Sequence, residues 1–544
     1  MENTENKEKN IVKSGIKLSF LTLLSRILGV IREATKAHFL GTGTYADAFG
    51  IAFLIPNLLR RLFAENSISV AFIPTFKGYL EDDPKGKNKQ ETQQFLNATF
   101  TLISFLTTIV VVLGIILTPF IVRIFYKGTD VNGISETAIL TRIMFPYLIV
   151  ISIAALFQGM LNTMNIFSPS GFTPILFNLC VIAGTIILTK LNVFPGIDKE
   201  QAAARAMSIG VITGGTIQAF FQLPFVIKTG WKVGFTSLKK TFTNPGTKKV
   251  IALIIPTIIG MATYQLNDLV STALAGRAGE GIVSSLQYSL RLQELILGIF
   301  AVSIGTVILP DLAGLAKKAQ WEEYNKMLLN AIKIIAMVCI PITFYSLITG
   351  REIISLVFKS NAFNDESVAK TLSVFIFHIA GLFFIAVNRI ISPAFYAQGN
   401  TKLPTLAGII SFGANIIFAF VFCIFWKGPG IALALSLSSV INTILLFIFL
   451  KYLKATDTKA IVKSTLIYCL KIVLFSVIAS IPIYFLHPVF TAHFADKGRF
   501  IGNGLPILFS AGIFAVIGVG LLFISKDEML FTVLRKFLKR GSKK

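Results

Sequence analysis

The chain has 544 residues, of which 54% are hydrophobic and 14% are charged, and its formal net charge is +24. Because a soluble domain usually has about 25% charged residues, this composition excludes an ordinary soluble protein and predicts one whose solvent is lipid. An excess of Lys and Arg marks the cytoplasmic loops of membrane proteins. Since no soluble basic domain interrupts the apolar segments, we expect no nucleic-acid partner.

Apolar segments of membrane length recur to the end of the chain, separated by charged or Gly/Pro-rich breaks. A transmembrane helix needs roughly 20 apolar residues, and about fourteen segments meet that requirement. They lie near residues 16–38, 45–76, 93–122, 137–162, 170–190, 203–228, 249–274, 281–313, 323–349, 367–396, 403–425, 429–451, 461–485 and 502–525. We therefore expect an all-α polytopic membrane protein with no separate soluble domain.

The first two of these segments carry more charge than a lipid-spanning helix should tolerate. A charge at the bilayer centre costs roughly 2.5–3.5 kcal/mol on insertion scales, so a cluster of charges predicts a polar cavity, a substrate, or both. The charged residues that we single out between residues 18 and 65 are Arg26, Arg32, Glu33, Asp47, Arg60, Arg61 and Glu65. In the eighth predicted helix, Arg291 and Glu294 are i,i+3 neighbours.

Arginine suits anion binding because its planar guanidinium pairs with phosphate bidentately and stays charged. One interpretation is that the cations line a single anion-binding cavity, with carboxylates holding their side chains in place. The arginines of that cavity would be Arg26, Arg32, Arg60 and Arg291. The alternative is that they form ion pairs between helices or snorkel to lipid headgroups. Because the cations outnumber the nearby acids, we prefer the cavity.

Three acids of these helices have structural alternatives. Glu65 is the i,i+4 partner of Arg61 near the predicted cytoplasmic end, and we interpret this pair as support for the cavity. Asp47 opens the second helix, where it either caps the helix or faces the cavity. Asp268, in the seventh helix, is either a cation or proton site or a partner for one of the arginines.

Two segments six helices apart resemble each other. In the fifth predicted helix, Asn178 precedes the tripeptide 195–197, and in the eleventh, Asn415 precedes the tripeptide 429–431; both tripeptides read Pro-Gly-Ile. A six-helix repeat is typical of transporters built from two parallel lobes with the substrate site between them. We therefore expect two six-helix lobes, with two helices left over at the C-terminus.

The expected parts are an N-terminal lobe at 1–228, a C-terminal lobe at 229–455, and helices thirteen and fourteen with a basic tail at 456–544. Breaks rich in Lys alternate along the chain with breaks that carry acids. The positive-inside rule then places both termini in the cytoplasm. The basic, partly amphipathic tail after residue 525 is expected to lie on anionic membrane lipids.

Nothing in the sequence predicts a cofactor or a reaction centre. The four cysteines are far apart in apolar runs, which favours neither a disulfide framework nor a metal cluster. No GxxxxGK[ST] loop is present, so the chain does not hydrolyse nucleotide itself. With no catalytic triad visible, we expect a membrane transporter and not an enzyme.

Several motifs stand out along the chain: SRILGVIRE (25–33), ADAF (46–49), PNLLRRLFAENSISVAFIP (56–74), FPY (145–147), GMLNT (159–163), RLQELILGIFAVSIGTVILP (291–310) and FYAQGNTKLP (395–404). Together these motifs resemble the MurJ (MviN) family, the bacterial lipid II flippases of the MOP exporter superfamily. The resemblance implies that the chain moves lipid II, the undecaprenyl-pyrophosphate-linked precursor of peptidoglycan, from the inner to the outer leaflet by alternating access. It also implies a multi-pass protein of the bacterial inner membrane that serves cell-wall biogenesis and cell shape.

The resemblance assigns roles residue by residue. Arg26, Arg32, Arg60 and Arg291 would be the family's cavity arginines, with Asp47 and Glu294 among its important acids. Glu33 stands where the family often has Asp. In some members an Asp of the seventh helix helps bind sodium, but this sequence has Ser271 there, one turn after Asp268. Ala419 stands where an eleventh-helix acid is expected, beside Asn415. Asp268 and Asn415 are therefore the candidates for a cation site, and either a coupling ion or the membrane potential would drive transport.

Two other readings remain. A MOP-type exporter could carry another lipid-linked oligosaccharide or a drug, although a drug site should be dominated by acids and aromatic residues. A non-transporting scaffold for cell-wall synthesis proteins would leave the intramembrane charges paired and dispensable. Neutral substitution of the cavity arginines separates a scaffold from a flippase.

Overall fold

The computed structural model describes residues 2–62, 68–81, 89–126, 131–454 and 456–541. Glu65 lies outside these residues. Every regular element in the described ranges is helical, which confirms the expected all-α class. The chain forms two compact units, Met1–Ser284 and Ser285–Lys544. The helix expected to open the second lobe therefore belongs to the first unit, and the three-part division at residues 228 and 455 stays a prediction.

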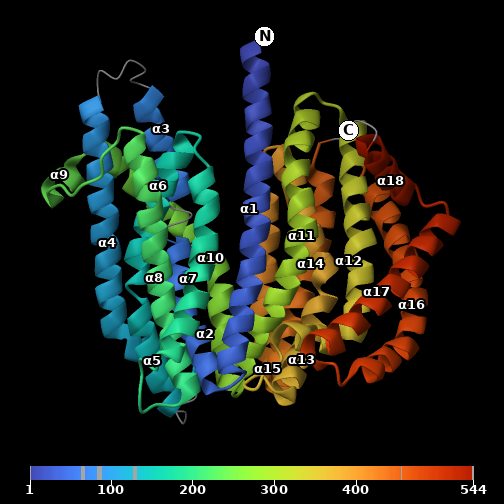
Figure 1. Cartoon of the computed structure of the whole chain (residues 1–544). Helices are drawn as coiled ribbons and strands as arrows, with labels where there is room; N and C mark the ends of the chain where they lie inside the picture. The colour runs from blue at the N-terminus through green and yellow to red at the C-terminus, as the bar shows by residue number, and fades with distance from the viewer. Residues whose placement is uncertain (1, 63–67, 82–88, 127–130, 455, 542–544) are drawn as a thin grey trace. The chain divides into compact units, whose positions relative to one another are not determined.

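The first unit is a helical bundle (Figure 1). Its elements are α1 (Glu2–Leu40), α2 (Thr44–Arg60), the π-helical turn η2 (Ile68–Phe72), α3 (Ile73–Glu81), α4 (Lys89–Arg123), α5 (Val131–Met144), α6 (Tyr147–Thr163), α7 (Ser168–Lys190), α8 (Lys199–Lys228), α9 (Leu238–Thr243) and α10 (Pro245–Ala278). Glycines let α7 and α8 approach closely: a Cβ added at Gly210 would lie 3.0 Å from the Cα of Val181. Small residues at such contacts are the usual means of helix packing in lipid.

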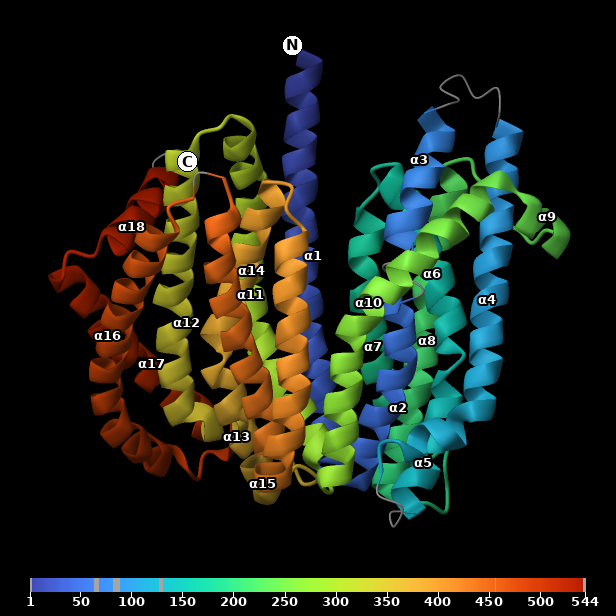
Figure 2. The same cartoon turned by 180° about the vertical axis from the view of Figure 1, so that it is seen from behind.

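The second unit is also helical, and Figure 2 shows its helices from behind. Its elements are α11 (Ile282–Lys317), which begins at the end of the first unit, α12 (Trp321–Phe358), α13 (Asp365–Ala380), α14 (Leu382–Ala397), α15 (Lys402–Phe449), the 3-10 turn η3 (Leu450–Tyr452), α16 (Thr458–Phe494), α17 (Gly498–Ile524) and α18 (Glu528–Gly541). In α16 the helix bends in its second half, which contains Pro482 and Pro488.

Two of the predicted spans are each divided into two helices. The segment predicted at 137–162 divides into α5 and α6 around Pro146, and the one at 367–396 divides into α13 and α14 at Gly381, with a bend of 41°. Conversely, the 48 residues of α15 would extend about 72 Å as one straight helix, which is more than twice the thickness of the hydrocarbon core of a bilayer. Lys427, with φ 50° and ψ −124°, breaks α15 in two, as the predicted segments 403–425 and 429–451 require.

Among the described residues, eight helices are long and apolar enough to cross a membrane, or nine if the bent pair α13–α14 forms one span. That set counts α15 once, although it is broken at Lys427. It leaves out α2, which has only 17 residues and contains Asp47 and Arg60. The prediction of about fourteen spans is consistent with these helices, and the exact number stays a prediction.

Candidate functional site

Arg32 is held inside the first unit by several contacts. Its Nη2 donates to Glu33 Oε1 over 2.7 Å, and its Nη1 donates to Asn178 Oδ1 on α7 over 3.2 Å. The guanidinium also lies 5.9 Å and 5.8 Å from the ring centroids of Phe53 and Phe177. Asn178 Nδ2 also donates to the Ser25 carbonyl over 3.2 Å, so Asn178 ties α7 to α1 at two points, Ser25 and Arg32. Sequence similarity had pointed to Asn178 only as part of a repeat.

Arg26 lies in a different setting, one turn and a half earlier on α1. It borders a cavity of about 300 Å³ between α1, α6 and α7, whose lining includes several polar side chains. Gln158 and Asn162 of α6 and Ser170 of α7 contribute to the lining. Asn162 Oδ1 accepts a hydrogen bond from Ser170 Oγ over 3.1 Å. Within the described chain Arg26 has no carboxylate in ion-pair contact.

A third cation of α1, Lys36, was not singled out from the sequence. It is only 2% exposed, its Nζ lies 5.7 Å from the Phe49 ring centroid, and it interacts electrostatically with Glu33 and Asp47. The signal that could have found it is the same one that found the arginines, a cation in an apolar helix. The buried charges of α1 and the start of α2 therefore form a connected series.

Asp47 is 4% exposed and acts as a cap, although not for its own helix. Its Oδ2 accepts the Gly281 N–H and its Oδ1 accepts the Ser284 N–H, each over 2.7 Å. These are N–H groups at the first turn of α11, which have no partner within the helix. In return, Glu280 Oε1 accepts the backbone N–H of Thr44, at the start of α2, over 2.9 Å. Each helix start is thus capped by a carboxylate from the other segment.

The two arginines at the end of α2 point to different partners. Arg60 Nε donates to Asn57 Oδ1, one turn earlier in the same helix, over 3.0 Å. Arg61 Nη1 lies 3.1 Å from Asp268 Oδ2 and 3.3 Å from Gln265 Oε1, both on α10. Of the two interpretations of Asp268, the structure thus supports the arginine partner.

In the second unit, Arg291 Nη1 donates to Glu294 Oε2 over 3.3 Å, as their i,i+3 spacing predicts. Arg291 Nε is buried and makes no hydrogen bond among the described residues. Asn415 is 3% exposed, and its Oδ1 accepts a hydrogen bond from Ser438 Oγ over 3.4 Å within α15. In the described chain no group of three His, Cys, Asp or Glu side chains could hold a metal ion.

Sequence reasoning missed several buried contacts that join helices. Glu136, 2% exposed, accepts two hydrogen bonds of 2.9 Å from Arg205, which locks α5 to α8. Asp527, 3% exposed, accepts Lys471 Nζ over 2.7 Å at the junction of α17 and α18. The partners in these ion pairs are separated by so many residues that they leave no local pattern in the sequence.

A second cavity, of about 350 Å³, lies among α12, α16 and α17 and is lined almost only by apolar side chains.

The fold defines a class of membrane transporter. An inward-facing multidrug resistance MATE family transporter of the MOP superfamily has the same fold, with a TM-score of 0.62 at 14% identity, covering 82% of this chain and 99% of the other. The sequence profile described as "Lipid II flippase MurJ" matches residues 36–499. The chain belongs to the MurJ family.

Relatives over most of the chain agree with that assignment. A probable lipid II flippase MurJ of Treponema pallidum (strain Nichols) is 45% identical over 531 residues, 97% of this chain and 98% of the relative. A probable lipid II flippase MurJ of Vibrio cholerae is 31% identical over 448 residues, covering 81% and 82%. A solved lipid II flippase MurJ in an inward closed conformation has a TM-score of 0.76 at 26% identity, covering 94% and 99%.

Proposed function

We propose that this chain flips lipid II from the inner to the outer leaflet of the bacterial inner membrane by alternating access. Lipid II combines a pyrophosphate, sugars and a peptide with a polyprenyl tail. The names of the relatives supply the substrate, and the charges of α1 supply the chemistry. Both termini and the Lys-rich breaks would lie in the cytoplasm.

The observation that carries the proposal is the contrast between Arg26 and Arg32. Arg32 contacts Glu33 and Asn178, whereas Arg26 borders a cavity with polar side chains in its lining and has no carboxylate in ion-pair contact among the described residues. A cation without a partner in an apolar helix is expensive unless an anion or water occupies the space beside it. The amide and hydroxyl groups of Gln158, Asn162 and Ser170 can hydrogen-bond phosphate or sugar oxygens there.

The membrane potential would favour this direction of transport. An inside-negative potential drives negative charge outward, so moving about two negative charges outward gains roughly 4–5 kcal/mol per 100 mV. A sodium ion at Asp268 is less favoured, because the structure pairs that carboxylate with Arg61. We therefore propose the potential as the energy source.

The test is substitution of the arginines in cells depleted of the native chain. For Arg26→Ala and Arg291→Ala we expect lipid II accessible on the outer surface to fall about tenfold or more, the equivalent of about 1.4 kcal/mol of lost anion binding. The readout is cleavage of lipid II by a hydrolase added outside the cells. Arg123→Ala, at an exposed position in the last turn of α4, is the matched control.

Normal accessibility in both cavity variants would refute the flippase proposal and favour the scaffold. A loss that also occurs in Arg123→Ala would show that removing any arginine disturbs the protein. Thermal melting of each purified variant separates lost binding from lost folding.

A further inference from the structure

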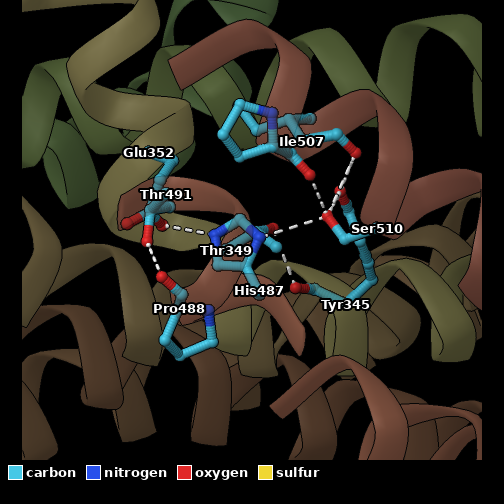
Figure 3. Close-up of polar contacts among 9 residues, drawn as sticks. Tyr345, Thr349, Glu352, His487, Pro488, Thr491, Ile507 and Ser510 are labelled. Atoms are coloured by element: carbon cyan, nitrogen blue, oxygen red, sulfur yellow. Dashed lines mark hydrogen bonds and ion pairs between the residues drawn. The ribbon is translucent and has the colours of Figure 1, made fainter. Parts of the chain in front are cut away.

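Three helices of the second unit meet around a buried histidine (Figure 3). His487 of α16 is 4% exposed. Its Nε2 lies 3.0 Å from Glu352 Oε2 of α12, whose side chain is 16% exposed, and its Nδ1 lies 3.2 Å from Ser510 Oγ of α17. The contact with Glu352 has the distance of an ion pair but not the alignment of a hydrogen bond. This cluster has no part in the anion binding proposed above.

The hydrogen bonds around His487 bear on the positions of two protons, the hydroxyl proton of Ser510 and the proton on Nδ1 of His487. Ser510 Oγ donates to the Pro506 carbonyl, one turn earlier in α17, and Tyr345 Oη donates to the Ile507 carbonyl over 2.6 Å. A hydroxyl has one proton, and a carbonyl can only accept. With Ser510 Oγ donating to Pro506, its lone pair accepts from His487, and in this tautomer Nδ1 carries a proton.

With Nδ1 protonated, a neutral imidazole would present the lone pair of Nε2 to Glu352. An ionised carboxylate at 3.0 Å would then face a second acceptor in a buried place, which is strongly unfavourable. One proton between the two groups removes the conflict, whether it resides on Nε2 or on the carboxyl. In this tautomer the geometry favours a pair that binds a proton.

The neighbouring charged groups are engaged elsewhere. Arg351, next to Glu352 on α12, pairs with Asp365 of α13 over 3.5 Å. Arg499, at the start of α17, donates to the carbonyls of Leu356 and Val357 at the end of α12. On α12 itself, Tyr345 is the ionisable group on which Glu352 acts electrostatically.

On the remaining elements, Glu366 of α13 pairs with Lys370, and His493 of α16 packs against the Phe494 ring. Within the described chain, α13, α14 and α15 place no ionisable group in hydrogen-bond or ion-pair contact with Glu352 or His487. The described residues of these three helices therefore supply no counter-charge to the pair.

We propose that Glu352 and His487 form a proton-binding site whose bound proton fastens α16 to α12. The same helices line the apolar cavity of about 350 Å³, to which Tyr345 and Ser476 contribute. Loss of the proton would make the Glu352–His487 contact repulsive and loosen that wall of the cavity. At low pH a second proton binds, and the Nε2–H of His487 then faces the carbonyl oxygen of a protonated Glu352. A donor still faces an acceptor, so the contact should weaken only as the pH rises.

The direct test is the protonation state of the pair in the full chain in detergent micelles. The sequence has four histidines, so ¹⁵N-histidine labelling with His487→Gln as the assignment variant identifies the signal. Infrared spectroscopy, with Glu352→Gln as the reference, reports a protonated carboxyl. Near neutral pH we expect either a His487 ring protonated on both nitrogens or a protonated Glu352. A neutral imidazole together with an ionised Glu352 would overturn the proposal. The main result is measured on the wild-type chain, so it does not depend on whether a variant folds.

The second test is the pH dependence of thermal stability. The amide of Glu352→Gln can donate to Nε2 at any pH, so this variant should lose less stability than the wild type between about pH 7 and about pH 10, by at least about 2 °C in melting temperature. The exposed Glu366→Gln should keep the wild-type profile. Parallel profiles for the wild type and Glu352→Gln would contradict a proton that fastens the two helices.

Discussion

At the scale of single residues, charges in lipid-spanning helices differ in whether the fold neutralises them. Glu136 with Arg205 and Asp527 with Lys471 are buried pairs whose partners come from different helices. Breaking such a pair by removing one member leaves the other without compensation, which is more destabilising than replacing both. These pairs join helices, whereas Arg26 borders a cavity. The same guanidinium group therefore joins two helices at Arg205 and lines a cavity at Arg26.

Asp527 provides a prediction about pH. It lies in the turn between α17 and α18, where its Oδ1 accepts the N–H groups of Met529 and Leu530 over 3.0 Å and 3.1 Å. Burial alone would raise the pKa of Asp527, but the hydrogen bonds from Lys471 and Leu530 outweigh it and hold the pKa below its ordinary value of 3.8. The stability that Asp527 contributes is therefore present above that value and is lost as the pH falls through the lower pKa of the folded state.

For Asp527→Asn we expect a loss of about 1–3 kcal/mol in the free energy of unfolding at neutral pH. The difference from the wild type should shrink as the pH falls below about 4. Denaturation followed across this range checks both statements. Glu528→Gln, at the exposed neighbouring position, should show neither effect.

At the scale of elements, the turn between α10 and α11 is built around reciprocal caps. Gly281 has a φ of 79°, and a Cβ there would lie 2.4 Å from the Thr42 carbonyl oxygen. The close approach brings the Gly281 N–H to Asp47. A carboxylate that accepts two N–H groups at a helix start also complements the helix dipole.

We expect Asp47→Ala to lower the free energy of unfolding by about 1–2 kcal/mol, because two buried N–H groups lose their acceptor. Asp47→Asn keeps one acceptor oxygen and should lose less. Chemical denaturation of the two purified variants measures the order. Equal stability of Asp47→Ala and the wild type would show that the caps do not stabilise the turn.

At the scale of the whole molecule, the distribution of lysines determines orientation. The breaks that would face the cytoplasm are rich in Lys, and anionic lipid and the membrane potential both favour that side for positive charge. The same orientation would place the α12–α13 turn outside. This predicted orientation rests on loop charge and not on the packing of the helices.

Cysteine accessibility tests this orientation. Lys239→Cys in α9 should react with a membrane-impermeant thiol reagent only after the cells are opened, and Asn361→Cys in the α12–α13 turn should react in intact cells. Both positions are exposed. The native cysteines, which form no disulfide among the described residues, are replaced first: Cys180, Cys339, Cys423 and Cys469. The opposite pattern of labelling would contradict cytoplasmic termini.

The sequence by itself determined the lipid solvent, the approximate positions of the helices, the break within the long α15 region, and the family. Hydropathy, helix breakers and motifs are local properties, so they survive without any knowledge of contacts. The i,i+3 pair of Arg291 and Glu294 was predictable for the same reason. Only the tertiary structure decided that Arg61 contacts Asp268, that Asp47 caps α11, and that His487 faces Glu352. Those partners lie on different helices. Which helices pack together depends on the complementary shapes of their whole surfaces, and no short stretch of sequence predicts that.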